Sequence, residues 1–139
     1  MRGSHLWRRA IGRLLDWVQA PFGISPMPQR KVHSPAQALW QPMLLAGQRL
    51  PGVSWKTLAD AGPWQAYWMK MAPGSRSIPH RHAAVELLQV LEGEVMDVDG
   101  QLFRAGDSLV YAPGSEHWLR SPQGCLLLVV ESEPSTLGE

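Results

Sequence analysis

The sequence predicts an all-β protein, with one antiparallel β-barrel of the jelly-roll type and an amphipathic α-helix before it. Short apolar segments alternate with turn signals over residues 38–132, which is the pattern of a barrel or jelly roll. The 13 glycines and 12 prolines supply the turns that many short strands need. With 139 residues, of which 45% are hydrophobic and 18% charged, the chain fits a globular protein with one folded domain.

Residues 1–37 are predicted to lie outside the barrel. Residues 1–5 read MRGSH, which is a native start or the start of a common expression tag, and we assign them no function. Residues 21–37 are a predicted linker, because four prolines there allow no long regular element. Residues 6–20 form a predicted amphipathic helix. Its apolar half holds Leu6, Trp7, Ala10, Ile11, Leu14, Leu15, Trp17 and Val18.

The composition of this predicted helix suits two roles. Its apolar face can pack on the barrel or on a second subunit, and we expect this role because most helices are stabilised by packing. Its arginines and two tryptophans also suit contact with an anionic membrane surface. No apolar run reaches the ~20 residues that a membrane span needs, and arginines interrupt any signal-peptide core.

Charge is spread unevenly along the chain. Residues 1–31 carry six basic residues and one acidic residue, a net charge of +5, whereas the rest carries seven basic and eleven acidic residues, a net charge of −4. We therefore expect a basic tail on a mildly acidic domain, and no nucleic-acid partner. The single Cys125 excludes an internal disulfide and a cysteine-rich zinc knuckle, and we expect it to be a buried, inert thiol in a cytoplasmic protein.

The barrel strands are predicted as short segments that turns separate. Residues 38–45 open the domain, with Trp40 as an anchor, and Asp99-Gly100 is a strong hairpin signal. The other predicted strands are 50–60, 64–71, 87–91, 94–98, 101–103, 108–111 and 125–131. Residues 133–139 are a polar tail for which the sequence predicts no structure.

A metal site is predicted from ligand-type residues in two separate stretches. His80, His82 and Glu86 follow one another in the order H-x-H-x3-E. Two histidines at positions i and i+2 of a strand point to the same side. His117 follows a turn signal further along the chain and supplies a fourth ligand. Neutral imidazoles and a carboxylate that converge make a mixed nitrogen and oxygen site for one divalent metal ion.

These two stretches resemble the motifs of the cupin family. The first matches G-x5-H-x-H-x3-E-x6-G at every fixed position over residues 74–93. The second matches G-x5-P-x-G-x2-H over residues 106–117, except that Ala112 stands where the family usually has proline; Ser121 replaces a final asparagine. Neither departure affects a ligand. The resemblance implies a jelly-roll barrel that binds one divalent metal ion, with Fe, Zn, Mn and Ni all open.

Over residues 40–131 the sequence is similar to the cupin module of ChrR-type anti-sigma factors. The stretches that carry this similarity include PGVSWKTL, VLEGE, APGSEHW and GCLLLVVE. The same branch includes small single-domain cupins and mononuclear-metal dioxygenases, such as those that cleave β-diketones. ChrR-type regulators hold their sigma factor with a separate helical zinc domain that has paired cysteines, and this sequence has only one cysteine.

The resemblance leaves two main functions open. The first is a metal-dependent enzyme of the dioxygenase type that acts on a small, partly apolar substrate. The candidate walls of its cavity are Leu88, Val90, Lys56, Tyr67, Tyr111 and Trp118. The second is a non-enzymatic zinc-binding sensor of the ChrR type without the sigma-binding domain. A metal-free isomerase is a third, weaker option, and the resemblance also implies a homodimer.

Overall fold

The computed structural model describes residues 28–45, 47–132 and 136–137. The chain divides into two units, residues 1–32 and 33–139, and the barrel is in the second unit. The predicted helix over residues 6–20 lies outside the described residues. No helix in the described part of the chain is long and apolar enough to cross a membrane.

The described residues form twelve strands and one short 3-10 turn, η1 (Pro35–Gln37). The strands are β1 (Gln41–Leu45), β2 (Gln48–Ala61), β3 (Trp64–Met71), β4 (Ser75–Arg76), β5 (His80–Arg81), β6 (Glu86–Met96), β7 (Leu102–Arg104), β8 (Ser108–Tyr111), β9 (Glu116–His117), β10 (Arg120–Ser121), β11 (Cys125–Glu131) and β12 (Thr136–Leu137). The predicted bounds of the strands over 64–71, 108–111 and 125–131 agree with β3, β8 and β11.

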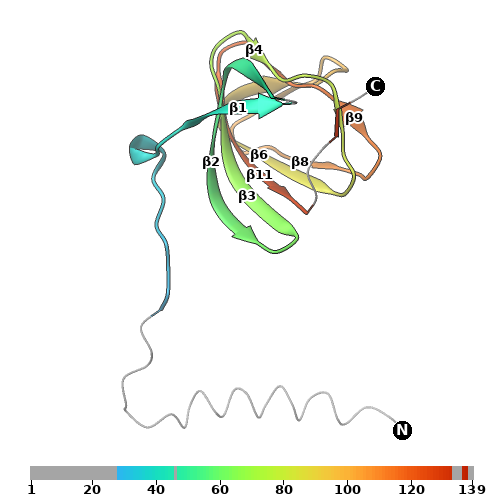
Figure 1. The fold of residues 1–139 in the computed structure, drawn as a ribbon. Coiled ribbons are helices and arrows are strands. Elements are labelled where there is room, and N and C mark those ends of the chain that lie inside the picture. The colour runs from blue at the N-terminus through green and yellow to red at the C-terminus, as the bar shows by residue number, and fades with distance from the viewer. Residues whose placement is uncertain (1–27, 46, 133–135, 138–139) are drawn as a thin grey trace, which may run out of the picture. The chain divides into compact units, whose positions relative to one another are not determined.

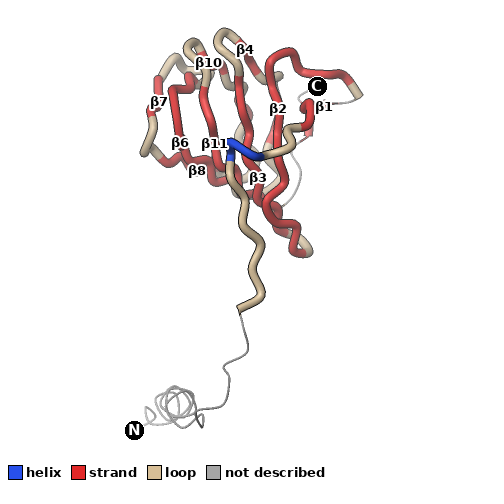
Figure 2. The backbone as a smooth tube through the Cα atoms, turned by 90° about the vertical axis from the view of Figure 1, so that its left-hand side faces the viewer, coloured by secondary structure: helices blue, strands red, loops and turns tan. Residues whose placement is uncertain are grey.

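Two antiparallel sheets make up the barrel. The larger has nine strands in the order β1-β2-β3-β11-β6-β10-β4, with β7 and β8 also paired to β6. The smaller has three strands in the order β12-β5-β9. The sheets curl around an interior, as Figure 1 shows, and β3, β11 and β6 run side by side along one wall (Figure 2). The predicted all-β antiparallel architecture is therefore confirmed.

One strand of the larger sheet is longer than predicted. The segment over 87–91 and the first three residues of the segment over 94–98 belong to a single strand, β6, which continues through Gly93 and ends at Met96. Gly93 has φ +73°, and a Cβ there would collide with the carbonyl oxygen of Gly124, the residue just before β11. The register between β6 and β11 shifts next to this point, between Leu126 and Leu127. A glycine that reads as a turn in the sequence thus allows a bulge within a continuous strand.

The inward-facing side chains of β3, β6 and β11 form an apolar core. Leu127 is fully buried, and Leu88, Val90 and Val129 are each 1% exposed. Cys125 at the start of β11 is also buried, as the sequence predicts, and burial raises the pKa of its thiol. This alternation of buried and exposed residues determines which side chains of each strand can reach the interior.

Candidate metal centre and cavity

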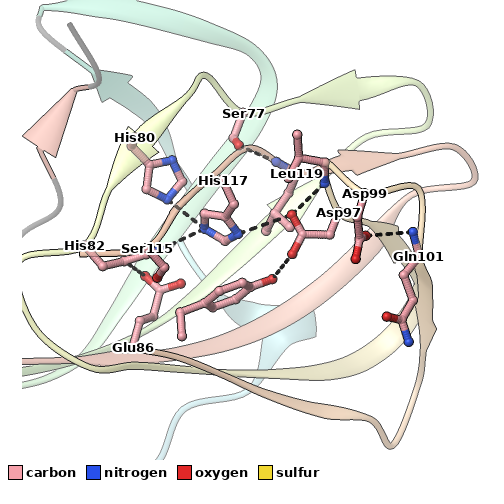
Figure 3. A network of polar contacts seen from close by, with 12 residues as sticks. Ser77, His80, His82, Glu86, Asp97, Asp99, Gln101, Ser115, His117 and Leu119 are labelled. Carbon is pink, nitrogen blue, oxygen red and sulfur yellow. Dashed lines mark hydrogen bonds and ion pairs between the residues drawn. The ribbon is translucent and has the colours of Figure 1, made fainter. Parts of the chain in front are cut away.

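Three histidines meet at one side of the barrel. His80 on β5 and His117 on β9 are directly opposite each other in the smaller sheet, and His82 follows β5. The Nε2 atom of His117 is 2.9 Å from that of His80 and 2.9 Å from that of His82 (Figure 3). The three ligand nitrogens all lie within 4.8 Å of one another. The i and i+2 spacing thus places the imidazoles of His80 and His82 on the same side of the chain, where both face His117.

The protonation of these rings suits a metal ion. His80 Nδ1 donates to the carbonyl oxygen of Ile78 at 2.9 Å, so the lone pair of a neutral ring lies on Nε2. Burial, and then the charge of His80, lower the pKa of His82 and of His117 to about 4. Both rings are therefore neutral at pH 7, which is the form that binds metal ions.

The other side of His117 faces a carboxylate. Its Nδ1 atom is buried, has no hydrogen bond within the described structure, and lies 3.6 Å from Asp97 Oδ1. The hydroxyl of Tyr111 donates to Asp97 Oδ2 at 2.6 Å, and the Tyr111 ring centroid is 4.0 Å from that of His117. The Tyr111 ring also stacks on His82 at 5.4 Å. The hydrogen bond from Tyr111 therefore holds the carboxylate of Asp97 in place, with its Oδ1 atom toward Nδ1 of His117.

Glu86 lies beside the histidines but outside the group whose ligand atoms converge. It is 5% exposed at the start of β6, and its Oε2 atom is 3.6 Å from His82 Nδ1, the nitrogen that faces away from the other two rings. Its role as a fourth metal ligand, which the sequence motif predicts, stays a prediction.

A second buried carboxyl group lies against Glu86. Glu131, 8% exposed at the end of β11, is its direct partner across the strand pair. Burial, followed by the neighbouring Glu131, raises the pKa of Glu86 to about 8. Burial also raises the pKa of Glu131, whereas its hydrogen bonds with Glu86 and Tyr67 act in the opposite direction. At pH 7 the pair therefore holds one proton, which we place on Glu86, while Glu131 accepts the hydrogen bond.

The barrel interior holds a cavity of about 270 Å³ next to these groups. Its lining comes from both sheets and is mostly apolar. The lining residues are Met43, Leu44, Leu45, Leu50, Trp55, Gln65, Tyr67, Met69, Ser77, His80, Glu86, Leu88, His117, Leu119, Val129 and Glu131. A cavity of this size suits a small molecule with an apolar body.

The structure brings two of the predicted wall residues, Leu88 and Tyr67, to this cavity. The other four lie elsewhere. Val90 is packed in the core two residues further along β6. Lys56 and Trp118 alternate with Trp55 and His117, which face the interior, and Tyr111 lies against the histidine rings. These differences follow from strand alternation, whose phase the sequence does not reveal.

The sequence did not single out four groups that contribute to the site. Glu131 shares the inward parity of Val129 and Leu127 along its strand, which was a usable signal. Gln65 pairs with Glu131 across β3 and β11, a register that no local pattern gives. Strand β1 lines the cavity with Met43, Leu44 and Leu45, and Asp97 reaches His117 from the end of β6.

Comparisons with known proteins agree on the fold. The sequence profile of the family described as ChrR Cupin-like domain matches residues 28–135. No curated protein matches the sequence significantly. Many solved structures are similar.

Three of these structures illustrate the range. An acetylacetone dioxygenase from Acinetobacter johnsonii has a TM-score of 0.69 at 13% identity, over 86% of this chain and 85% of that one. An RmlC-like cupin from Shewanella frigidimarina has a TM-score of 0.63 at 22% identity, over 76% and 93%. Rhodobacter sphaeroides SigE in complex with the anti-sigma ChrR has a TM-score of 0.58 at 23% identity, over 88% and 75%. At these identities the likeness shows the fold alone.

Proposed function

We propose that this chain, which belongs to the family of ChrR cupin-like domains, binds one divalent metal ion and acts on a small, partly apolar molecule in the barrel cavity. The observation that carries this proposal is the convergence of three imidazole rings, two of which, His80 and His117, line a mostly apolar cavity. The Nε2 atoms of His80 and His82 each lie 2.9 Å from that of His117, so one cation could be bound by all three rings.

The residues of the site have two roles, which are to bind the ion and to bind the substrate. His80, His82 and His117 would hold the ion, with Glu86 as the proposed fourth ligand. When bound, the ion supplies a Lewis acid and, if it is iron or manganese, a redox centre. The apolar walls bind the body of the substrate and limit the entry of water. Glu86 and Glu131 both line the cavity, and with Glu86 bound to the ion, Glu131 would be the carboxyl group that exchanges a proton with a bound molecule.

An enzyme is favoured over a sensor by this carboxyl pair. The sequence alone offers no acid or base beyond the predicted ligands, and the fold adds Glu131 at the same cavity. Burial raises the pKa of Glu131, and a buried carboxyl group with a raised pKa that is not itself a proposed ligand is suited to proton transfer. A dioxygenase-type reaction on a β-diketone is the first to test, because acetylacetone is named as the substrate of one structural neighbour.

A zinc-binding sensor is the second candidate function. The family match and the similarity to the ChrR complex favour it. In that case the ion would be zinc, the site would be closed, and a ligand in the cavity would change binding to a partner instead of being converted.

Metal analysis joined to an oxygen-uptake assay tests the proposal. The protein is purified without added metal, its metals are measured, and oxygen consumption is recorded with acetylacetone and related β-diketones after loading with Fe(II), Mn(II), Ni(II) or Zn(II). We expect close to one metal per chain in the wild type and none after joint replacement of His82 and His117 by Ala. His33→Ala, which removes a histidine outside the cluster, is the matched control.

Two outcomes would change the proposal. Full metal occupancy in the double variant would contradict the site. Zinc as the only bound metal, with no turnover, would favour the sensor.

Assembly and location remain proposals. We propose a homodimer in the cytoplasm, and we propose that the predicted helix over residues 6–20 packs on protein and not on a membrane surface. A monomer in analytical sedimentation at high protein concentration would contradict the homodimer. Cosedimentation with anionic vesicles, lost in a chain that begins at Ser34, would contradict packing on protein.

A further inference from the structure

A row of polar side chains crosses one wall of the cavity. Glu86, Glu131 and Gln65 are neighbours across β6, β11 and β3, because Glu131 pairs with Glu86 on one side and with Gln65 on the other. All three line the cavity, and we call them the polar row. The next pair toward the core on β6 and β11 is apolar, with Leu88 opposite Val129. The polar row is therefore a narrow band at the edge of an otherwise apolar wall formed by β3, β11 and β6.

Apart from the histidines, the charged side chains that line this cavity are all acidic. Among the described residues that line it, Glu86 and Glu131 are the acidic ones, and neither lysine nor arginine is present. The carboxyl groups are 5% and 8% exposed, so water screens their charge little. Glu131 accepts hydrogen bonds from Glu86 and Tyr67, and a carboxylate has acceptor sites for more than two donors.

We propose that Glu131 determines which substrates the cavity accepts. The favoured substrate is a small molecule with an apolar body, an oxygen that reaches the metal, and a neighbouring O–H or N–H group that donates to the Glu131 carboxylate. A molecule with a carboxylate at that second position is excluded. The metal contact in this description rests on the proposed function, whereas the contact with Glu131 does not.

The physical reason has two parts. A hydrogen bond to a buried carboxylate is charge-assisted and about twice as strong as a neutral one. An analogue without the donor leaves a buried acceptor unpaired and loses affinity for that reason as well. A second carboxylate placed against Glu131 meets repulsion that no lysine or arginine of the described lining relieves.

Three matched phenols test this assignment. Catechol, 2-methoxyphenol and 2-hydroxybenzoate share one phenol oxygen and differ at the neighbouring position, which is a donor, a methyl ether or a carboxylate. Their affinities are measured by titration calorimetry with the zinc-loaded protein. We expect catechol to bind at least about tenfold more tightly than each of the other two. Glu131→Gln, which keeps the shape and removes the charge, should bring 2-hydroxybenzoate to within about threefold of catechol.

Controls separate this proposal from the proposed function. Glu92→Gln removes an exposed carboxylate from the same strand as Glu86 and should leave the order of affinities unchanged. The same titrations with the metal-free protein measure the preference in the absence of the ion. If the metal-free protein prefers catechol and Glu131→Gln removes this preference, the assignment is supported even if metal binding fails. Equal binding of catechol and 2-hydroxybenzoate to the wild type overturns it. So does a preference that survives in Glu131→Gln, or the absence of catechol binding at millimolar concentration.

Discussion

The histidine cluster and the two buried glutamates meet at the same cavity, which His80, His117, Glu86 and Glu131 line, but they belong to different sheets. His80 and His117 face each other across the small sheet, whereas Glu86 and Glu131 face each other across β6 and β11 of the large one. Burial shifts pKa values in the two groups in opposite directions, downward for His82 and His117 and upward for Glu86 and Glu131, because it favours the neutral form of each. The neutral histidines leave lone pairs that need a cation. The glutamates satisfy each other with one shared proton.

The largest expected effect comes from removing one of the converging nitrogens. His117→Ala should lower metal affinity by about 100-fold or more, because the Nε2 atom of His117 is the one that neighbours both others. Glu86→Gln, which removes a proposed ligand outside the converging group, should lower it about tenfold. Competition with a chelator of known affinity measures both. Equal losses in the two variants would show that the histidines and Glu86 do not differ as described.

The opposite pKa shifts predict a stability maximum for the metal-free protein near pH 6.5. The histidines with pKa near 4 take up protons on unfolding, so stability falls as the pH drops below about 6.5. Glu86, with a pKa near 8, releases its proton on unfolding, so stability falls as the pH rises from about 4.5 to 8. The two histidines outweigh one carboxyl below pH 6.5, and the carboxyl acts alone above it.

Denaturant unfolding in the presence of a chelator, at intervals from pH 4.5 to 8.5, tests this profile. We expect a loss of about 2 kcal/mol in unfolding free energy on each side of the maximum. Glu86→Gln should flatten the alkaline side and steepen the acid side, where Glu86 partly opposes the two histidines. A stability that rises steadily to pH 8.5 would contradict the protonated carboxyl pair.

Asp97 offers a test of how the histidines are positioned. Asp97→Asn should lower metal affinity by about tenfold, because the carboxylate that faces His117 Nδ1 at 3.6 Å orients the ring and raises its basicity. Tyr111→Phe, which removes the hydrogen bond that holds Asp97, should have a smaller effect in the same direction. Asp60→Asn at an exposed strand end is the control. Unchanged affinity in Asp97→Asn would assign Asp97 to the fold alone.

The smallest effect is expected at the surface of the small sheet. Arg81 and Glu116 form an ion pair at 3.0 Å next to the paired histidines, with side chains that are 57% and 52% exposed. Glu116→Gln should change unfolding free energy by less than about 1 kcal/mol and leave metal affinity unchanged, because exposed pairs contribute little. A larger loss of metal affinity would mean that this pair, and not burial, holds the histidine strands together.

The histidine motif can be read from the sequence, whereas the contact between Glu131 and Glu86 cannot, although the inward parity of Glu131 on its strand can. The positions of His80 and His82 follow from spacing along one strand, and His117 belongs to a recognisable motif. The contact between Glu86 and Glu131 depends on how β6 and β11 are registered, and that register includes a bulge near Gly93 that a local pattern does not show. The phase of strand alternation is also not visible in the sequence, and Lys56 and Trp118 are not among the residues that line the cavity. The predicted helix lies outside the described residues, so its packing is still a prediction.

The proton shared by Glu86 and Glu131 gives metal uptake a stoichiometry that can be counted. His82 and His117 are already neutral at pH 7, so they release no proton when an ion arrives. Glu86 is still protonated there, and it must lose its proton to become a ligand. Calorimetry in buffers of different ionisation enthalpy should therefore register close to one proton released per ion. In a cell this exchange would make metal occupancy follow small changes of pH around neutrality, through a residue that is not a histidine.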